Sequence, residues 1–268
     1  MNTEKLAADT DRHFIERLTW DEVARRIHDG APAILPIGAA AKQHGFHLPL
    51  NTDRLQAEWL AARIAGPVDA LIWPTLTYGH YPAFVGYAGS SSLSAPTFEA
   101  LVHEVATGIL GAGCRKLFVL NTGISTLAPV DRALARLDAI RVMHVWIHEG
   151  PRYPRVAKAL AQQSHGSHAD ELETSLMLAL APDLVDMTRA EASPAVTGDT
   201  PGPLTPSDPN SPNYSRSGSY GDPTLATAAK GEMLLAAILD DLNEHVAAFV
   251  AKTSAAEQGS GTSRSSSQ

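Results

Sequence analysis

The chain has one cysteine, no long apolar run and no excess of basic residues, and each shortage excludes a class of protein. Cys114 alone forms neither an internal disulfide nor a thiolate cluster for zinc, which fits a reducing compartment. No apolar run approaches the roughly 18 residues that cross a bilayer. The N-terminus lacks the basic start and the apolar segment of a secretory signal. We therefore expect a cytoplasmic protein that does not contact membranes.

The charge balance gives no reason to expect a nucleic acid partner. The 21 basic and 29 acidic side chains give a formal net charge of −8, whereas binding to a phosphate backbone requires clustered Lys and Arg. Eleven histidines are present, and four of them fall in two local clusters, His44 with His47 and His165 with His168. These clusters indicate a functional site.

Apolar patterning predicts one α/β domain over residues 16–250, preceded by an N-terminal extension at 1–15. Continuous apolar runs at 32–37, 70–76, 116–120 and 140–147 predict strands of a sheet covered on both faces. Helices are expected at 20–29, 54–65, 96–111, 127–137, 170–180 and 225–250. Because strands and helices alternate, the sheet should be mostly parallel.

Two segments have the composition of irregular structure. Residues 193–223 are rich in Pro, Ser, Gly and Asp and are expected to form a long loop that covers a substrate. The tail at 251–268, rich in Ser and Gly, has too little apolar area to offset chain entropy and is expected to be disordered.

Polar side chains cluster where the predicted strands end. The first strand leads to Lys42, Gln43, His44, His47 and Asp53; the strand ending at Leu120 leads to Asn121; the last leads through His148 toward His168 and Glu173. Carboxyl ends of parallel strands meet at one sheet edge, where ligands bind. An imidazole with two carboxylates suits a divalent cation, so we expect His44, Asp53 and Glu173 to hold Zn²⁺, Mn²⁺ or Fe²⁺.

The same segments resemble the creatininase (creatinine amidohydrolase) family. Its first motif, approximately G-S-x-E-Q-H-G-P-H-L-P-L-x-T-D, is matched by Gly38, by the run Gln43-His44-Gly45-Phe46-His47-Leu48-Pro49-Leu50 and by Thr52-Asp53. Its H-A-G-x-x-E-T-S motif is similar to residues 168–175, and its late G-x-x-G-D-P segment to residues 218–223.

The resemblance implies an α/β/α sandwich, assembled as a hexamer, with two adjacent divalent metals. By this resemblance Asp53 matches the bridging aspartate, His44 a histidine ligand, and Glu173 the glutamate at or beside the metals. His168 matches a histidine placed near the substrate as a proton-transfer group.

Three departures from the family pattern affect the site. Lys42 stands where the motif has a glutamate ligand, and Asn121-Thr122-Gly123 lacks the histidine of the family's N-G-H motif. Phe46 replaces the motif proline. Our hypothesis is that one metal has been lost and that the Lys42 ammonium stands near its place, beside Asp53, because a lysine facing that carboxylate is stabilised by the pairing.

The sequence thus predicts an amidohydrolase with one cation, in which His168 protonates the departing nitrogen of a small cyclic or linear amide and Lys42 stabilises the oxyanion. His47, His80 and Asn121 are candidates for substrate contacts. Each residue also has a structural alternative: Asp53 can cap a helix, Asp170 and Glu173 can form a capping box, and Asn121 can shape a turn. His148 is more often a structural residue. Two alternatives at the level of the protein are a non-catalytic binding or scaffold member of the fold and a peptidase acting on a modified peptide.

Overall fold

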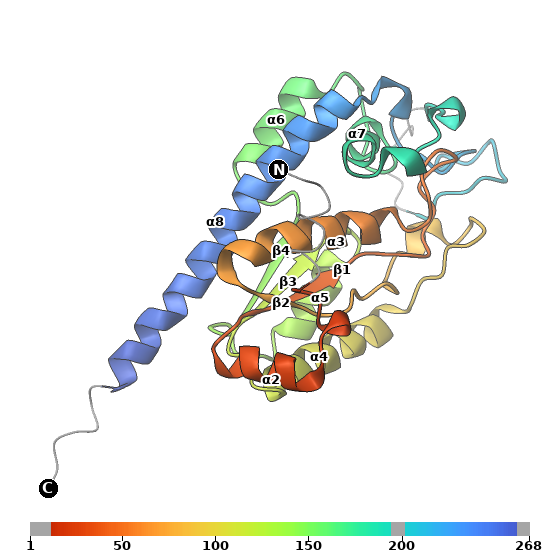
Figure 1. The fold of residues 1–268 in the computed structure, drawn as a ribbon. Coiled ribbons are helices and arrows are strands. Elements are labelled where there is room, and N and C mark those ends of the chain that lie inside the picture. Colours follow the sequence, from red (N-terminus) through yellow and green to blue (C-terminus); the bar gives the residue numbers. More distant parts are fainter. Residues whose placement is uncertain (1–11, 194–201, 262–268) are drawn as a thin grey trace, which may run out of the picture.

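The computed structural model describes residues 12–193 and 202–261 and places helices on both faces of one sheet (Figure 1). The strands are β1 (Ala33–Ile37), β2 (Leu71–Ile72), β3 (Leu117–Asn121) and β4 (Val142–Trp146). The α-helices are α2 (Trp20–His28), α3 (Thr52–Ala65), α4 (Ala95–Gly111), α5 (Leu127–Leu134), α6 (Arg152–Leu160), α7 (Glu171–Leu180) and α8 (Ala228–Gly261). This arrangement confirms the predicted three-layer α/β/α sandwich.

The sheet is parallel throughout its four strands, in the order β2-β1-β3-β4. Strands β1 and β3 are neighbours, with Ala33 opposite Leu117 and Ile37 opposite Asn121. The chain adds β2 on one side of β1 and then crosses to add β3 on the other side. The loops after β1 and β3 therefore leave in opposite directions, and such a switch point opens a crevice at the carboxyl edge of a sheet.

Alternate residues of the central strands pack into two separate hydrophobic cores, one on each face of the sheet. Ile34 and Phe118 pack with α3 and α8 on one face, whereas Leu35 and Val119 pack with α4 and α5 on the other. Because β1 and β3 are buried on both faces, they read as continuous apolar runs. The two cores fix the ends of β1 and β3, from which the polar loops begin.

Two elements differ from the sequence prediction. Strand β2 covers only Leu71–Ile72 instead of residues 70–76, because Pro74 has no N–H to donate to the ladder; pairing resumes only as an isolated bridge between Ile37 and Leu76. Helix α6 was not predicted, since its nine residues include three basic residues and a proline that interrupt its apolar positions.

Both ends of the predicted domain also differ. His13 and Phe14 lie within the fold, since His13 Nδ1 lies 2.8 Å from the Ala70 carbonyl oxygen and Phe14 bridges to Ile72. Helix α8 continues to Gly261, past the predicted start of a disordered tail at 251. The alanine, lysine and glutamate of this stretch favour helix, which the prediction from apolar area had not weighed. Residues 262–268 lie outside the described residues, as do 194–201 of the predicted long loop.

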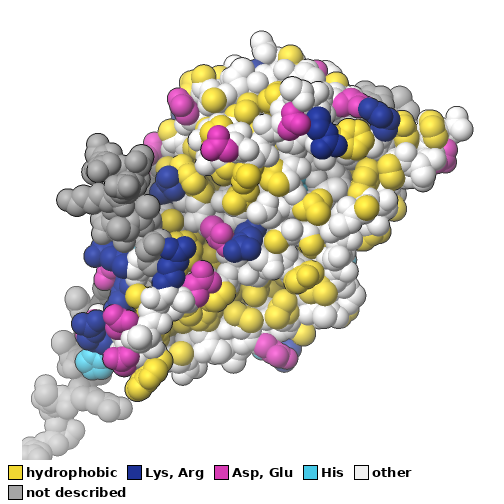
Figure 2. Space-filling model, turned by 45° about the vertical axis from the view of Figure 1, so that its right-hand side comes forward, with side chains coloured by type: hydrophobic (Ala, Val, Ile, Leu, Met, Phe, Trp, Pro, Cys, Tyr) yellow, Lys and Arg dark blue, Asp and Glu magenta, His cyan; other side chains and the backbone are white. Residues whose placement is uncertain are grey.

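The surface has a mixed charge distribution. On the face drawn in Figure 2, Lys and Arg side chains lie among Asp and Glu, and the described residues form no extended basic surface there. No helix in the described part of the chain is both long enough and apolar enough to cross a bilayer.

Candidate active site

The polar residues predicted from the strand ends do meet at the crevice between β1 and β3. Loops after these strands, the segment following β2 and the start of α7 gather at the right-hand side of the view in Figure 1. Lys42 and His44 come from the loop after β1, Asp53 from the first turn of α3, and Glu173 from the first turn of α7. His168 precedes α7 and is tied by an antiparallel bridge to Tyr220.

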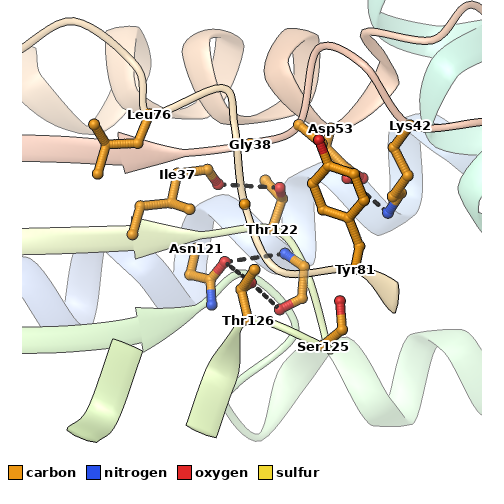
Figure 3. Close-up of a pocket in the computed structure, with 13 residues that line it drawn as sticks. Ile37, Gly38, Lys42, Asp53, Leu76, Tyr81, Asn121, Thr122, Ser125 and Thr126 are labelled. Atoms are coloured by element: carbon orange, nitrogen blue, oxygen red, sulfur yellow. Dashed lines mark hydrogen bonds and ion pairs between the residues drawn. The ribbon is translucent and has the colours of Figure 1, made fainter. Parts of the chain in front are cut away.

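Lys42 and Asp53 form a buried ion pair, as the one-metal hypothesis requires. Lys42 Nζ lies 2.7 Å from Asp53 Oδ2, and the side chains are 8% and 5% exposed. Burial by itself would raise the pKa of Asp53, but the charges of Lys42 and His44 hold this pKa well below its usual range. Asp53 is therefore an anion at neutral pH, and Figure 3 shows the Lys42 ammonium directed at it beside the Tyr81 ring.

His44, His168 and Glu173, here called the donor cluster, are the group in the described residues whose donor atoms suit a metal ion. One donor atom of each lies within 4.8 Å of the others. His44 Nε2 lies 3.8 Å from Glu173 Oε1, and His168 Nδ1 lies 3.8 Å from Glu173 Oε2. Two imidazoles and a carboxylate are a common set for Zn²⁺. His168, which was predicted as a proton donor, is thus a member of the donor cluster, and Asp53 Oδ1 lies 3.1 Å from His44 Nε2.

The N-terminal turn of α7 positions Glu173. Asp170 caps the helix, its Oδ1 accepting hydrogen bonds from the N–H groups of Leu172 at 3.0 Å and Glu173 at 2.9 Å. The Ala169 N–H in turn donates to Glu173 Oε2 at 2.6 Å. Ala169 has a φ of 45°, in the left-handed region that costs a non-glycine residue about 1–2 kcal/mol. Asp170 is therefore the helix cap, but the predicted capping box is not formed, because Glu173 accepts from the Ala169 N–H and not from the Asp170 N–H.

A small cavity lies beside the Lys42–Asp53 pair (Figure 3). It has a volume of about 10 Å³, which is room for about one water molecule. Tyr81, Gly123 and Ser125 are among its lining residues. The Tyr81 hydroxyl is buried without a hydrogen-bond partner in the described structure, and burial raises its pKa to about 12.

A much larger cleft of about 740 Å³ opens over the same groups. Lys42, Asp53, His168 and Glu173 line it, together with Thr122–Ser125 after β3. Its walls are partly aromatic, and the aromatic side chains that line it are Phe84, Trp146, Tyr153 and Tyr220. Drug-sized ligands occupy clefts of this volume and character. Leu204 and Asn213, from the predicted long loop, also line it.

The three residues predicted to contact substrate do not line the large cleft. His47 Nε2 is 2.8 Å from Thr174 Oγ1, and burial, with the nearby His44, lowers the pKa of His47 to about 4. His80 Nδ1 lies 3.0 Å from the Leu93 carbonyl oxygen. Asn121 Oδ1 accepts from the Gly123 N–H and the Thr126 hydroxyl, so Asn121 shapes the turn after β3. Asn121 lines the small cavity, and none of the three lines the large cleft.

Sequence reasoning missed the aromatic wall of the cleft. His148 stacks on Tyr153 with ring centroids 4.2 Å apart and meets the edge of Trp146 at 4.9 Å. Burial lowers the pKa of His148 to about 4, and its Nε2 has no hydrogen-bond partner in the described structure. The one available signal was the position of Trp146 and His148 at the end of the last strand, where ligands bind.

Comparisons with known proteins agree with the motifs. The family model described as creatininase, creatinine amidohydrolase, matches residues 16–246. A creatinine amidohydrolase of Pseudomonas putida is 29% identical over 247 residues, covering 83% of this chain and 91% of the relative. A mycofactocin precursor peptide peptidase of Mycolicibacterium smegmatis is 29% identical over 239 residues, covering 83% of this chain and 87% of the relative.

Solved structures give the same answer. A crystal structure of creatinine amidohydrolase (creatininase) matches with a TM-score of 0.76 at 26% identity, covering 87% of this chain and 96% of that one. A structure described as creatininase Mn matches with a TM-score of 0.74 at 25% identity, covering 87% and 97%. The predicted resemblance is confirmed: the chain belongs to the creatininase family and is a hydrolase that acts on carbon–nitrogen bonds.

Proposed function

We propose that this protein is a metal-dependent amidohydrolase that cleaves the C–N bond of a small cyclic or linear amide in the 740 Å³ cleft. One observation carries the proposal: two imidazole nitrogens and a carboxylate converge beside that cleft, within 4.8 Å of one another. Neutral imidazole and carboxylate are the ligands of catalytic Zn²⁺, and Mn²⁺ and Fe²⁺ accept the same types.

The donor cluster fits a divalent cation by its own chemistry. Each histidine has one ring nitrogen hydrogen-bonded to a backbone carbonyl, and its other nitrogen lies 3.8 Å from a Glu173 oxygen; that nitrogen of His44 also lies 3.1 Å from Asp53 Oδ1. Metal-binding histidines are typically held in this way. A cation bound there would supply water activated near neutral pH and would polarise the amide carbonyl.

Lys42 supplies positive charge on the other side of the site. One of its three N–H groups donates to Asp53 Oδ2 at 2.7 Å. Because Lys42 lines the cleft, the other two N–H groups can donate to a substrate oxygen. A fixed cation in a largely dehydrated site stabilises the negative charge that develops on an amide oxygen during attack. Phe84, whose ring lies 5.1 Å from Lys42 Nζ, helps to keep water from it.

A peptidase function is the second candidate, and two observations favour it. One curated relative is described as a mycofactocin precursor peptide peptidase. The cleft, at about 740 Å³, takes ligands well above the size of a single small ring. A terminal segment of a modified peptide therefore fits as well as a small amide.

Metal removal and restoration tests the proposal. The protein is stripped with a chelator, shown to be metal-free by elemental analysis, and assayed on creatinine, other small cyclic and linear amides and short peptides, with and without added Zn²⁺ or Mn²⁺. We expect turnover of at least one compound to disappear on stripping and to return with metal, and the Glu173→Gln variant to lose it. Full turnover by the metal-free protein would contradict the proposal; turnover of peptides alone would select the second candidate.

A further inference from the structure

His168 lies where it can act either as a proton shuttle or as a metal ligand. Only one of its two ring nitrogens is available for either role. His168 Nε2 lies 2.9 Å from the Gln43 carbonyl oxygen. A carbonyl only accepts, so Nε2 carries the proton and the neutral ring has its lone pair on Nδ1. Nδ1 faces Glu173 Oε2 at 3.8 Å. A nitrogen whose lone pair binds a cation is not free to carry a proton to a leaving group.

His44 is held in the complementary way. Its Nδ1 lies 2.9 Å from the Lys42 carbonyl oxygen and therefore carries the proton, which leaves the lone pair on Nε2. Nε2 faces two carboxylates, Asp53 Oδ1 at 3.1 Å and Glu173 Oε1 at 3.8 Å. A lone pair directed at anionic oxygen is unfavourable by itself. Without metal, a proton on Nε2 donated to Asp53 removes the conflict, and a metal cation bound at Nε2 would replace that proton.

The spacing of the donor cluster suits one small cation. With bonds of about 2.0–2.1 Å and tetrahedral angles, ligand atoms of Zn²⁺ lie roughly 3.3 Å apart. The two histidine-to-Glu173 distances are 3.8 Å, one to each oxygen of the carboxylate. With one donor atom from each residue the three atoms lie within 4.8 Å of one another, so side-chain shifts of up to about 1.5 Å bring them to bonding distance of one cation. The Ala169 N–H holds Glu173 Oε2 at 2.6 Å, and Gln56 Nε2 reaches Glu173 Oε1 at 3.4 Å. All three side chains are thus fixed by neighbouring groups.

Asp53 has a second partner besides His44, the Lys42 ammonium. Its Oδ2 is 2.7 Å from the Lys42 ammonium, and both side chains are buried. A dication bound to the same carboxylate would stand beside that ammonium in a poorly solvated site, where like charges repel strongly. The neighbouring cavity, at about 10 Å³, leaves room for a water rather than a hydrated ion.

We propose that the cation of this chain is held by His44 Nε2, His168 Nδ1 and Glu173, and that the Lys42–Asp53 ion pair lies beside the cation without binding it. This assignment rests on the metal dependence proposed above and deepens it. It gives a mononuclear site with two imidazoles and one carboxylate, in which His168 is a ligand and Asp53 is not.

Metal titrations of full-length variants separate the two ligand sets. Stripped protein is titrated with Co²⁺ and followed by calorimetry, by the visible spectrum of bound Co²⁺ and by elemental analysis after dialysis. We expect one Co²⁺ per chain, a loss of affinity of at least about 100-fold in His168→Ala, and a change below about threefold in the paired variant Lys42→Met with Asp53→Leu. His80→Ala, a histidine outside the site, is the matched control.

Each outcome has a fixed meaning. Three results would overturn the assignment while leaving metal dependence intact. They are unchanged Co²⁺ affinity in His168→Ala, loss of Co²⁺ binding in the paired Lys42→Met, Asp53→Leu variant, and two Co²⁺ ions per wild-type chain. Absence of binding by wild-type protein would remove the proposed function as well.

A measurement on the unmodified chain covers the case in which a variant misfolds. Long-range ¹H–¹⁵N spectra of the stripped protein should show His44 protonated at Nδ1 and His168 protonated at Nε2. Added Zn²⁺ should then change the ¹⁵N chemical shift of the ring nitrogen that binds it, Nε2 of His44 and Nδ1 of His168. If Nε2 of His168 is unprotonated, or if Zn²⁺ changes the ¹⁵N shifts of His44 alone, the assignment is wrong.

Discussion

Lys42 and Asp53 remove two full charges from water and compensate each other within the fold. Their side chains are 8% and 5% exposed, and the atoms that carry the charge are 2.7 Å apart. A buried pair of this kind gives little net stability compared with apolar residues of similar size, although removing one partner alone leaves an uncompensated charge. Its presence at the floor of the cleft is therefore better explained by chemistry than by stability.

The pair predicts an asymmetry between single and double substitution. Lys42→Met leaves the Asp53 carboxylate buried without its cation and should lower the free energy of unfolding by about 3–5 kcal/mol. Adding Asp53→Leu should recover most of this loss. Denaturant unfolding at pH 7 measures both, with Arg54→Ala, which breaks an exposed pair with Glu58, as a control that loses less than about 1 kcal/mol. Equal losses in the single and double variants would contradict this reading.

His148 predicts a pH dependence of stability. Burial lowers its pKa to about 4, whereas the unfolded chain has a pKa near 6.5. Between these values the unfolded chain binds a proton here and the folded chain does not, so stability falls as the pH decreases. Between pH 7 and 4.5, wild-type protein should lose about 2 kcal/mol more than His148→Phe.

Urea unfolding at the two pH values measures this difference. His28→Phe, which alters an exposed histidine on α2, is the control and should follow the wild type. If His148→Phe shows the same pH dependence as the wild type, His148 is not a buried neutral imidazole.

At the scale of elements, α7 joins helix capping to site geometry. Asp170→Ala removes the acceptor of two backbone N–H groups and should cost about 1–2 kcal/mol of stability. Because the same turn positions Glu173, the variant should also bind Co²⁺ about 10–100-fold more weakly. Asp186→Ala, which removes the exposed cap of a short 3-10 turn, is the control and should leave Co²⁺ affinity unchanged. If Asp170→Ala lowers stability but leaves Co²⁺ affinity unchanged, the cap does not position Glu173 for metal binding.

The sequence predicted helices and strands where one apolar pattern decided the outcome. Buried strands β1 and β3 and helices α3, α4 and α7 lie close to their predicted positions because their burial is continuous or periodic. Strand β2 was overestimated because the apolar run continues through Pro74 while the hydrogen-bond ladder does not. Helix α6 was missed because its position depends on a distant residue, Asp241 of α8, whose carboxylate accepts from the Arg152 and Tyr153 N–H groups.

The residues of the candidate site and the pairing of Lys42 with Asp53 were predictable from the sequence, whereas the grouping of His168 with His44 and Glu173 was not. Motif spacing brought Lys42, His44, Asp53, His168 and Glu173 to one sheet edge, where the structure has them. The membership of His168 in the donor cluster depends on which of its ring nitrogens meets a backbone carbonyl, and sequence patterns carry no such information. The aromatic cleft wall depends likewise on loop shape.

At the scale of the whole molecule, the site exists only in the folded chain. Its residues come from positions 42–53 and 168–173, brought together by α3, α7 and the sheet. A ligand that binds the folded state alone stabilises it by mass action. Free Zn²⁺ at 100 times its Kd should raise the free energy of unfolding by about 2.7 kcal/mol, measured by urea unfolding. Glu173→Gln should show little increase; an equal increase would place the binding elsewhere.

Assembly as a hexamer, the cytoplasmic location and the absence of nucleic acid partners stay predictions. The described fold is one continuous domain with two cores around a single sheet. Its cleft draws on residues from both halves of the chain.

Crystals grown with Zn²⁺ and measured on both sides of the zinc absorption edge test directly whether His44, His168 and Glu173 hold the cation. We expect one anomalous peak per chain, within bonding distance of His44 Nε2, His168 Nδ1 and a Glu173 oxygen, and no peak at the cavity beside Lys42. A second peak bridged by Asp53, or a peak at Asp53 with His168 turned away, would contradict it.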